Sequence, residues 1–152
     1  MLQDQTIYEC LNTCKAEGYY FCADLSFYVA LKEELLPLFE AVDVLLTEEL
    51  VYEIKNFKHP FQKQGIDNRI FAMVDQISLL GHLHIIPNTK KIVDLHMYCH
   101  QIGLDYKNPA HLLLAYYSRW EKVEEKKVLF GTLEHSLYVK AKESGLQAVL
   151  FR

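Results

Sequence analysis

The sequence has no long apolar run and no marked excess of positive charge. A helix needs about 20 largely apolar residues to span a bilayer, and no stretch of that kind occurs. The opening residues MLQDQTIYEC lack the basic and apolar blocks of a signal peptide. We therefore expect a protein without a membrane span and without a secretion signal.

Lysine and arginine together number 16 against 20 acidic residues, which gives a formal net charge of −4. Broad, non-specific nucleic-acid binding depends on clustered Lys and Arg, so the balance argues against it. It does not exclude a nuclease, because carboxylates that hold a metal are themselves negative. The short basic stretches at 55–63 and 125–128 are best interpreted as solvated surface.

Several catalytic motifs are also missing. The sequence contains no Gly-rich phosphate loop, no GxSxG elbow, no HExxH and no paired CxxC. Four cysteines without a secretion signal indicate reduced thiols and a cytoplasmic location. The cysteines are Cys10, Cys14, Cys22 and Cys99. Cys10 and Cys14 are one helical turn apart, and we expect them to be buried as small apolar groups.

The chain does have the length and apolar content of one globular domain, with 152 residues of which 51% are hydrophobic. Strand and helix patterns alternate along it. Strands are predicted over 19–26, 42–47, 82–87, 126–132 and 146–151. Helices are predicted over 3–16, 27–36, 48–57, 67–81, 88–103, 108–120 and 133–145.

Local signals mark several helix ends. Thr47 and Asp67 are predicted N-caps, and Gly81 is a predicted stop. Asn108 followed by Pro109 is a strong start signal. Pro37 should end the helix that begins near residue 27, because proline disrupts an α-helix interior.

Alternating helices and apolar strands indicate parallel strands covered on both faces. The predicted fold is therefore a three-layer α/β/α sandwich with a mostly parallel central sheet. Sites in such sheets form beyond the carboxyl ends of the strands. Asp24 and Glu134 each follow a predicted strand closely, which makes this edge the place to look for a site.

Four short motifs add further acidic or amide side chains. They are FCADLSFYVAL with Asp24, LTEELVYEIK with Glu49 and Glu53, GLDYKNPAHLLLA with Asp105 and Asn108, and LFGTLEH with Thr132 and Glu134. In this order, and with the elements around them, they resemble the PIN domain family of small metal-dependent nucleases, which includes many toxin–antitoxin ribonucleases. The resemblance divides the chain into a helical extension at 1–18 and a PIN-like domain at 19–152.

The resemblance implies a divalent-metal-dependent ribonuclease that hydrolyses RNA phosphodiesters with Mg²⁺ or Mn²⁺. Asp24, Glu53 and Glu134 would be catalytic and would hold the metal, with Asn108 as a further ligand. Asn108 stands where the family has an aspartate, and Glu134 replaces a shorter aspartate. Because hard cations prefer anionic oxygens, these departures favour an alternative, a catalytically degenerate PIN-like domain that binds RNA or protein.

Each of these residues also has a purely structural interpretation. Asp24 and Asn108 can cap helices, and Glu134 gains from the dipole at a helix start. Glu53 can be an ordinary surface residue.

Histidines and tyrosines offer two further hypotheses. His96 and His100 lie one helical turn apart beside Cys99, and His82 and His84 share a strand face, which is compatible with a zinc site although no zinc motif is present. Among ten tyrosines, the pair at 116–117 lies near Arg119 and Lys122. Such residues can stack on RNA bases, form a homodimer or partner interface, or pack in the core.

Overall fold

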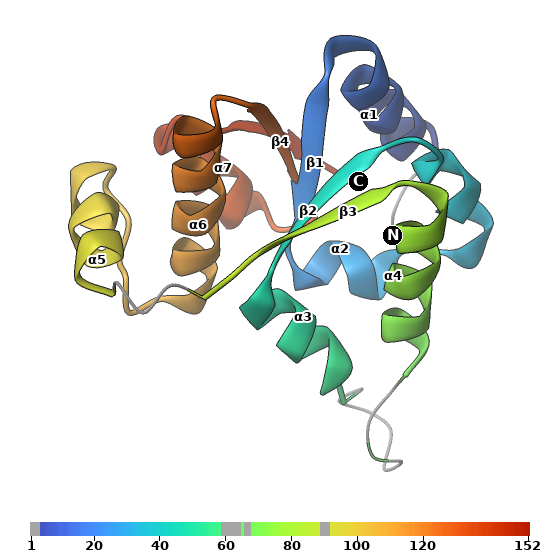
Figure 1. The fold of residues 1–152 in the computed structure, drawn as a ribbon, viewed down its shortest axis with the longest axis horizontal. Coiled ribbons are helices and arrows are strands. Elements are labelled where there is room, and N and C mark those ends of the chain that lie inside the picture. The colour runs from blue at the N-terminus through green and yellow to red at the C-terminus, as the bar shows by residue number, and fades with distance from the viewer. Residues whose placement is uncertain (1–3, 59–64, 66–67, 89–91) are drawn as a thin grey trace.

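A computed structural model describes residues 4–58, 65, 68–88 and 92–152. In it, helices lie on both sides of one central sheet (Figure 1). The elements in chain order are α1 (Asp4–Glu17), β1 (Tyr19–Ala23), α2 (Leu25–Ala30), the 3-10 helix η1 (Glu33–Phe39), β2 (Asp43–Thr47), α3 (Glu48–Lys55), α4 (Arg69–Leu80), β3 (His82–Ile86), α5 (Ile92–Gln101), α6 (Pro109–Glu124), β4 (Lys127–Thr132), α7 (His135–Glu143) and β5 (Gln147–Leu150).

All five described strands run parallel, in the order β3-β2-β1-β4-β5. Each coincides with a strand predicted from the sequence, so the predicted parallel sheet is confirmed. The largest difference is at β1, which ends at Ala23 rather than at residue 26. It ends there because α2 begins directly after Asp24.

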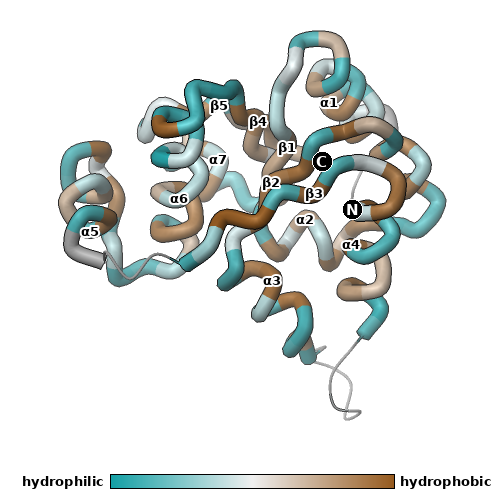
Figure 2. The backbone as a smooth tube through the Cα atoms, in the orientation of Figure 1, coloured by the Kyte–Doolittle hydropathy of each residue, from teal (hydrophilic) through white to brown (hydrophobic). Residues whose placement is uncertain are grey.

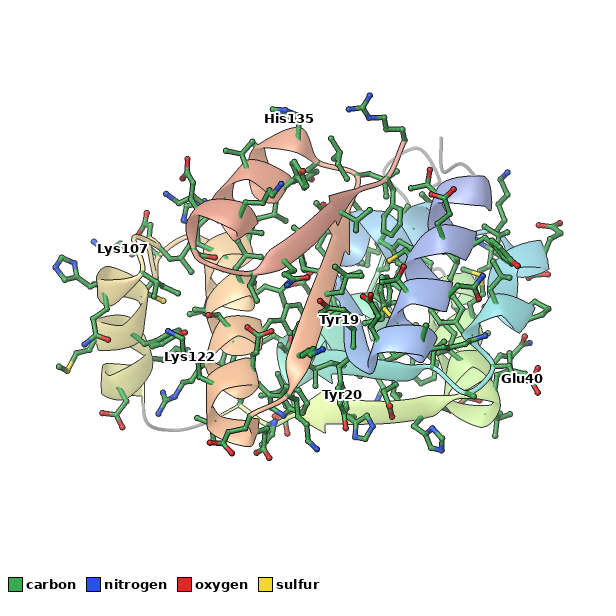
Figure 3. The ribbon with its side chains drawn as sticks, turned by 90° about the horizontal axis from the view of Figure 1, so that it is seen from above. Tyr19, Tyr20, Glu40, Lys107, Lys122 and His135 are labelled. Carbon is green, nitrogen blue, oxygen red and sulfur yellow. The ribbon has the colours of Figure 1, made fainter. Side chains whose placement is uncertain are left out.

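Side chains alternate between two apolar layers. On β1, Phe21 and Ala23 belong to one buried cluster while Cys22 belongs to the other. The first cluster includes residues of α1, α2, η1, α3 and α4, and the second includes residues of α5, α6 and α7. The view from above shows the sheet between these layers (Figure 3). The backbone coloured by hydropathy shows hydrophobic residues along β2 and β4 (Figure 2). The α/β/α sandwich is therefore confirmed.

The helix predicted over 27–36 is corrected by the structure. α2 ends at Ala30, Leu31 is extended, and the chain then forms η1, with Pro37 inside it. The proline ring would clash with the carbonyl four residues earlier in an α-helix. The chain instead forms a short 3-10 helix here, and short 3-10 segments are common where a regular α-helix does not continue.

Other predicted helix ends are confirmed. The Thr47 hydroxyl accepts a 3.0 Å hydrogen bond from the Leu50 N–H, and α4 ends at Leu80 with Gly81 as its C-cap. Asp67 lies outside the described residues, so its predicted cap is not described. α6 begins at Pro109 as predicted but continues to Glu124, four residues beyond the predicted end at 120.

The predicted N-terminal extension is packed into the main core. Ile7, Cys10, Leu11 and Cys14 of α1 are all buried in the cluster that includes Phe21 of β1. All four cysteines are buried free thiols, as expected for Cys10 and Cys14. Within the ranges given above, no helix has both the length and the apolar character needed to cross a bilayer.

Candidate active site

The candidate site lies where the chain changes direction across the sheet. From β1 the chain adds β2 and β3 on one side, and it later adds β4 and β5 on the other. β1 and β4 pair directly, with Ala23 opposite Gly131. A crevice forms beyond the carboxyl ends of strands at such a switch point, and it is the usual ligand site in open parallel sheets. Asp24 follows β1 here, and Glu134 follows β4.

A cleft of about 510 Å³ opens at this edge. Four carboxylates line it, Asp24, Glu49, Glu53 and Glu134, from the ends of β1 and β4 and from α3. The remaining lining residues are Leu25, Ser26, Val29, Thr47, Leu50, Pro109, Ala110, Leu113 and Leu137. The structure thus brings the three predicted catalytic residues, Asp24, Glu53 and Glu134, onto one concave surface.

Asp24 is the buried member of the group, with 7% of its surface exposed. The Ser26 hydroxyl lies 2.8 Å from one carboxylate oxygen and 3.0 Å from the other, so it donates to this carboxylate. Asp24 stands at the N-cap position of α2. Among the described residues, its side chain has no capping hydrogen bond of standard geometry to this helix. Ser26 holds this side chain in the cleft, and the Phe27 N–H at the start of α2 also favours its charged form by lowering its pKa.

The carboxylates influence one another. Burial raises the pKa of Asp24, and the negative charge of Glu134 raises it further, against the opposing effect of the Ser26 and Thr132 hydroxyls. Glu53 is exposed at its helix surface, but partial desolvation raises its pKa, with added repulsion from Glu49 and Asp24. The ionised forms of Asp24 and Glu53 are thus destabilised in the cleft, and a bound cation would stabilise them.

Glu49 and Ser26 belong to the cleft although neither was predicted as a site residue. Glu49 precedes Glu53 by four residues on α3, a spacing that places both on one helix face. That spacing was visible in the sequence. The role of Ser26, two residues after Asp24, depends on the backbone turning sharply from β1 into α2, which the sequence pattern did not fix.

Asn108 is used as a helix cap. Its side-chain oxygen accepts hydrogen bonds from the N–H groups of Ala110 at 3.0 Å and His111 at 3.4 Å. The next residues, Pro109 and Ala110, line the cleft, whereas Asn108 is not among the lining residues. Asp105 accepts from the Lys107 N–H at 3.0 Å and lines a different groove. The structure therefore supports the capping interpretation of Asn108.

No group of three or more His, Cys, Asp or Glu side chains in the described ranges is arranged to hold a metal ion. The histidines of the zinc hypothesis have other contacts. His96 stacks on Tyr106 with ring centroids 3.8 Å apart, and His84 lies 3.0 Å from an Asp43 carboxylate oxygen. Cys99 is fully buried. These contacts favour structural roles for the residues concerned.

The tyrosine pair at 116–117 is not an open stacking surface. Tyr117 is fully buried, and its hydroxyl donates a 2.9 Å hydrogen bond to the Ala23 carbonyl. Tyr116 is half-buried, and so is Trp120, which packs against Tyr20 with ring centroids 4.9 Å apart. The core-packing interpretation holds for Tyr117.

No protein-family model matches this chain, and no curated protein matches it. Among solved structures, it is similar to the crystal structure of PAE2754 from Pyrobaculum aerophilum. The two share 13% sequence identity with a TM-score of 0.51, over 88% of this chain and 92% of the other. At this identity the likeness shows a shared fold.

Proposed function

We propose that this protein is a divalent-metal-dependent ribonuclease of PIN-like type that hydrolyses RNA phosphodiesters in the acidic cleft. One observation carries the proposal. Asp24, Glu53 and Glu134 come from three separate parts of the chain, yet they line a single cleft at the switch point of the sheet. The resemblance of the sequence motifs to PIN domains supports the same assignment.

The chemistry of the donor set fits Mg²⁺ or Mn²⁺. These cations prefer anionic oxygen ligands, and the cleft supplies carboxylates whose mutual repulsion a cation would reduce. Asp24, Glu53 and Glu134 would hold the ion. Because the Asn108 oxygen already accepts two backbone hydrogen bonds, we leave it out of the ligand set. Once bound, a divalent ion activates water and neutralises charge on a phosphate.

The chain's own groups contribute orientation. Ser26 donates to Asp24 and its hydroxyl oxygen also accepts from the Leu133 N–H at 3.4 Å, so it links the ends of β1 and β4. The first residues of α6, Pro109 and Ala110, line the cleft. They bring the positive end of that helix dipole to the place where a phosphate would lie.

A second candidate function is a degenerate PIN-like module that binds RNA or a protein partner without cleaving. It is favoured by the use of Asn108 as a cap and by the lack, among the described residues, of a preformed three-ligand group. In both cases we propose a cytoplasmic location, since buried free thiols suit a reducing compartment.

The first test is a calorimetric titration of Mn²⁺ into metal-free protein, with Asp24→Asn and Asp75→Asn alongside. Asp75 is an exposed acid on α4 and serves as the matched control. We expect the parent and Asp75→Asn to bind and Asp24→Asn to lose most of the binding. Cleavage of a labelled oligoribonucleotide should show the same order.

Two results would contradict the proposal. If Asp24→Asn binds Mn²⁺ as tightly as the parent, the metal is held elsewhere. If the parent binds Mn²⁺ but leaves RNA intact in assays free of contaminating nuclease, the non-cleaving alternative takes its place.

A further inference from the structure

Tyr52 is a strongly exposed aromatic residue next to the acidic cleft. It lies on α3, and 69% of its surface is exposed. A groove of about 580 Å³ is lined by Tyr52 together with Glu48, Glu49, Glu53, Asn88 and Pro109. Three of these residues, Glu49, Glu53 and Pro109, also line the acidic cleft. The groove therefore continues from the cleft, and Tyr52 lies along it.

The side chain of Tyr52 has no ring contact, cation contact or hydrogen bond with any described residue. Two other exposed rings are already in contact with neighbours. Tyr106 stacks on His96, and Phe71 lies beneath the Lys55 ammonium group at 5.4 Å. Tyr52 thus presents a free ring face to solvent beside the place where the phosphodiester is proposed to lie.

The charges around Tyr52 limit what the groove can bind. Glu48, Glu49 and Glu53 all line it, so a phosphate would be repelled there. Glu48 is fixed in place, because one of its carboxylate oxygens accepts a 3.0 Å hydrogen bond from the Asn88 N–H. What the groove offers is the uncharged face of a ring. A nucleobase is uncharged and presents such a face, and stacking on aromatic side chains is the usual way of holding single-stranded bases.

We propose that Tyr52 is a base-stacking residue that holds the nucleobase adjoining the phosphate in the cleft, and that it thereby selects single-stranded RNA. The inference rests on the proposed function for the position of the phosphate. Bases in a duplex are stacked on one another and are not free for Tyr52, so paired RNA should gain nothing from it. Sequence preference should be weak, since every base has a ring face.

The test is binding of a fluorescein-labelled single-stranded oligoribonucleotide, followed by fluorescence anisotropy with Ca²⁺ as the divalent ion. The variants are Tyr52→Ala, Tyr52→Phe and, as a matched control, Tyr8→Ala. Tyr8 is 53% exposed and lies on α1, at the opposite end of the sheet from α3 (Figure 1). Urea unfolding of each variant verifies that the fold is kept.

We expect Tyr52→Ala to raise Kd about tenfold or more, the usual effect of losing one stacked base. Tyr52→Phe keeps the ring and should stay within about twofold of the parent, and Tyr8→Ala should not change Kd. A duplex of the same sequence should show no difference between the parent and Tyr52→Ala. An equal Kd for Tyr52→Ala and the parent on single strands, or no RNA binding by the parent, would overturn the inference.

A parallel cleavage assay with Mn²⁺ separates this inference from the proposed function. If the parent cleaves and Tyr52→Ala has the same KM and kcat, the stacking assignment is wrong while the nuclease proposal stands. If binding depends on Tyr52 but no cleavage occurs, the stacking assignment stands and the nuclease proposal fails.

Discussion

The hydroxyl of Tyr117 on α6 donates a hydrogen bond of 2.9 Å to the backbone carbonyl of Ala23, the last residue of β1. Both residues are fully buried. The bond ties α6, whose first residues line the cleft, to the backbone directly before Asp24. Tyr117 on α6 thereby helps to fix the position of the buried Asp24 carboxylate.

Tyr117 and Tyr28 form a natural pair for testing this bond. Tyr28 is also buried, but its hydroxyl has no hydrogen-bond partner among the described residues. Tyr117→Phe removes this buried hydrogen bond to the Ala23 carbonyl and should lower the free energy of unfolding by about 1 kcal/mol. Tyr28→Phe removes an unsatisfied hydroxyl and should be neutral or stabilising. Urea unfolding measures the free energy of unfolding of both variants. Equal losses in the two would show that the Tyr117 hydrogen bond does not stabilise the fold.

Asp24 should make the protein's stability depend on pH. Because burial and Glu134 raise its pKa in the folded state, the folded protein holds this proton more tightly than the unfolded chain does. The free energy of unfolding of the parent should therefore fall as pH rises from the ordinary Asp value of 3.8 through the raised pKa. Asp24→Asn lacks this loss, so it should be more stable than the parent at pH 7.

The measurement is urea unfolding of the parent, Asp24→Asn and the control Asp75→Asn from pH 7.5 downward. The advantage of Asp24→Asn should shrink as pH falls through the raised pKa and should vanish below 3.8. An advantage that grows toward low pH would mean that the folded-state pKa of Asp24 is lowered instead.

The sequence predicted the fold well because its signals are local. Apolar runs such as 128–130 marked the strands, and the Thr47 and Asn108 caps marked helix starts. The order of elements then left few ways to build a covered parallel sheet. The break at Leu31 was missed because it lies six residues before Pro37, and the sequence alone does not show whether the chain bends or adopts a 3-10 turn there.

The candidate site was predicted less completely. Asp24 and Glu134 follow strands whose ends must meet, so their approach could be inferred from topology. The exposure of Tyr52 and the burial of Tyr117 depend on which helix face meets the sheet, and a tyrosine suits either environment. The two roles of Asn108, cap or ligand, have the same sequence signature, and only the hydrogen bonds of the folded chain separate them.

Asn108 therefore calls for its own substitutions. Asn108→Ala removes the acceptor for the Ala110 and His111 N–H groups and should cost about 1 kcal/mol of stability. Asn108→Asp keeps a good capping oxygen and should change stability by only a few tenths of a kcal/mol. Thermal or urea unfolding gives both values. A neutral Asn108→Ala would show that the cap contributes little to α6.

Gly81 is required for close packing between two backbone segments. The turn after α4 runs against the segment before β2, where the Ala41 N–H donates to the Leu80 carbonyl at 3.1 Å and the His82 N–H donates to the Val42 carbonyl at 2.9 Å. A Cβ at Gly81 would lie 2.7 Å from the Phe39 carbonyl oxygen and closer still to that of Val42. Since both obstacles are backbone atoms, they cannot move aside as a flexible side chain can.

Gly81→Ala should therefore cost about 1–3 kcal/mol or more, through overpacking. Gly145→Ala is the matched control. Its Cβ would meet no described heavy atom within 4 Å, but its φ of +96° is unfavourable for alanine, so this substitution should cost about 1 kcal/mol through the backbone alone. Urea unfolding at one pH compares the two. A larger loss for Gly81→Ala would show that steric contact between the segments outweighs backbone strain, and a loss equal to or smaller than that of Gly145→Ala would mean that the 39–42 segment can shift to admit the methyl group.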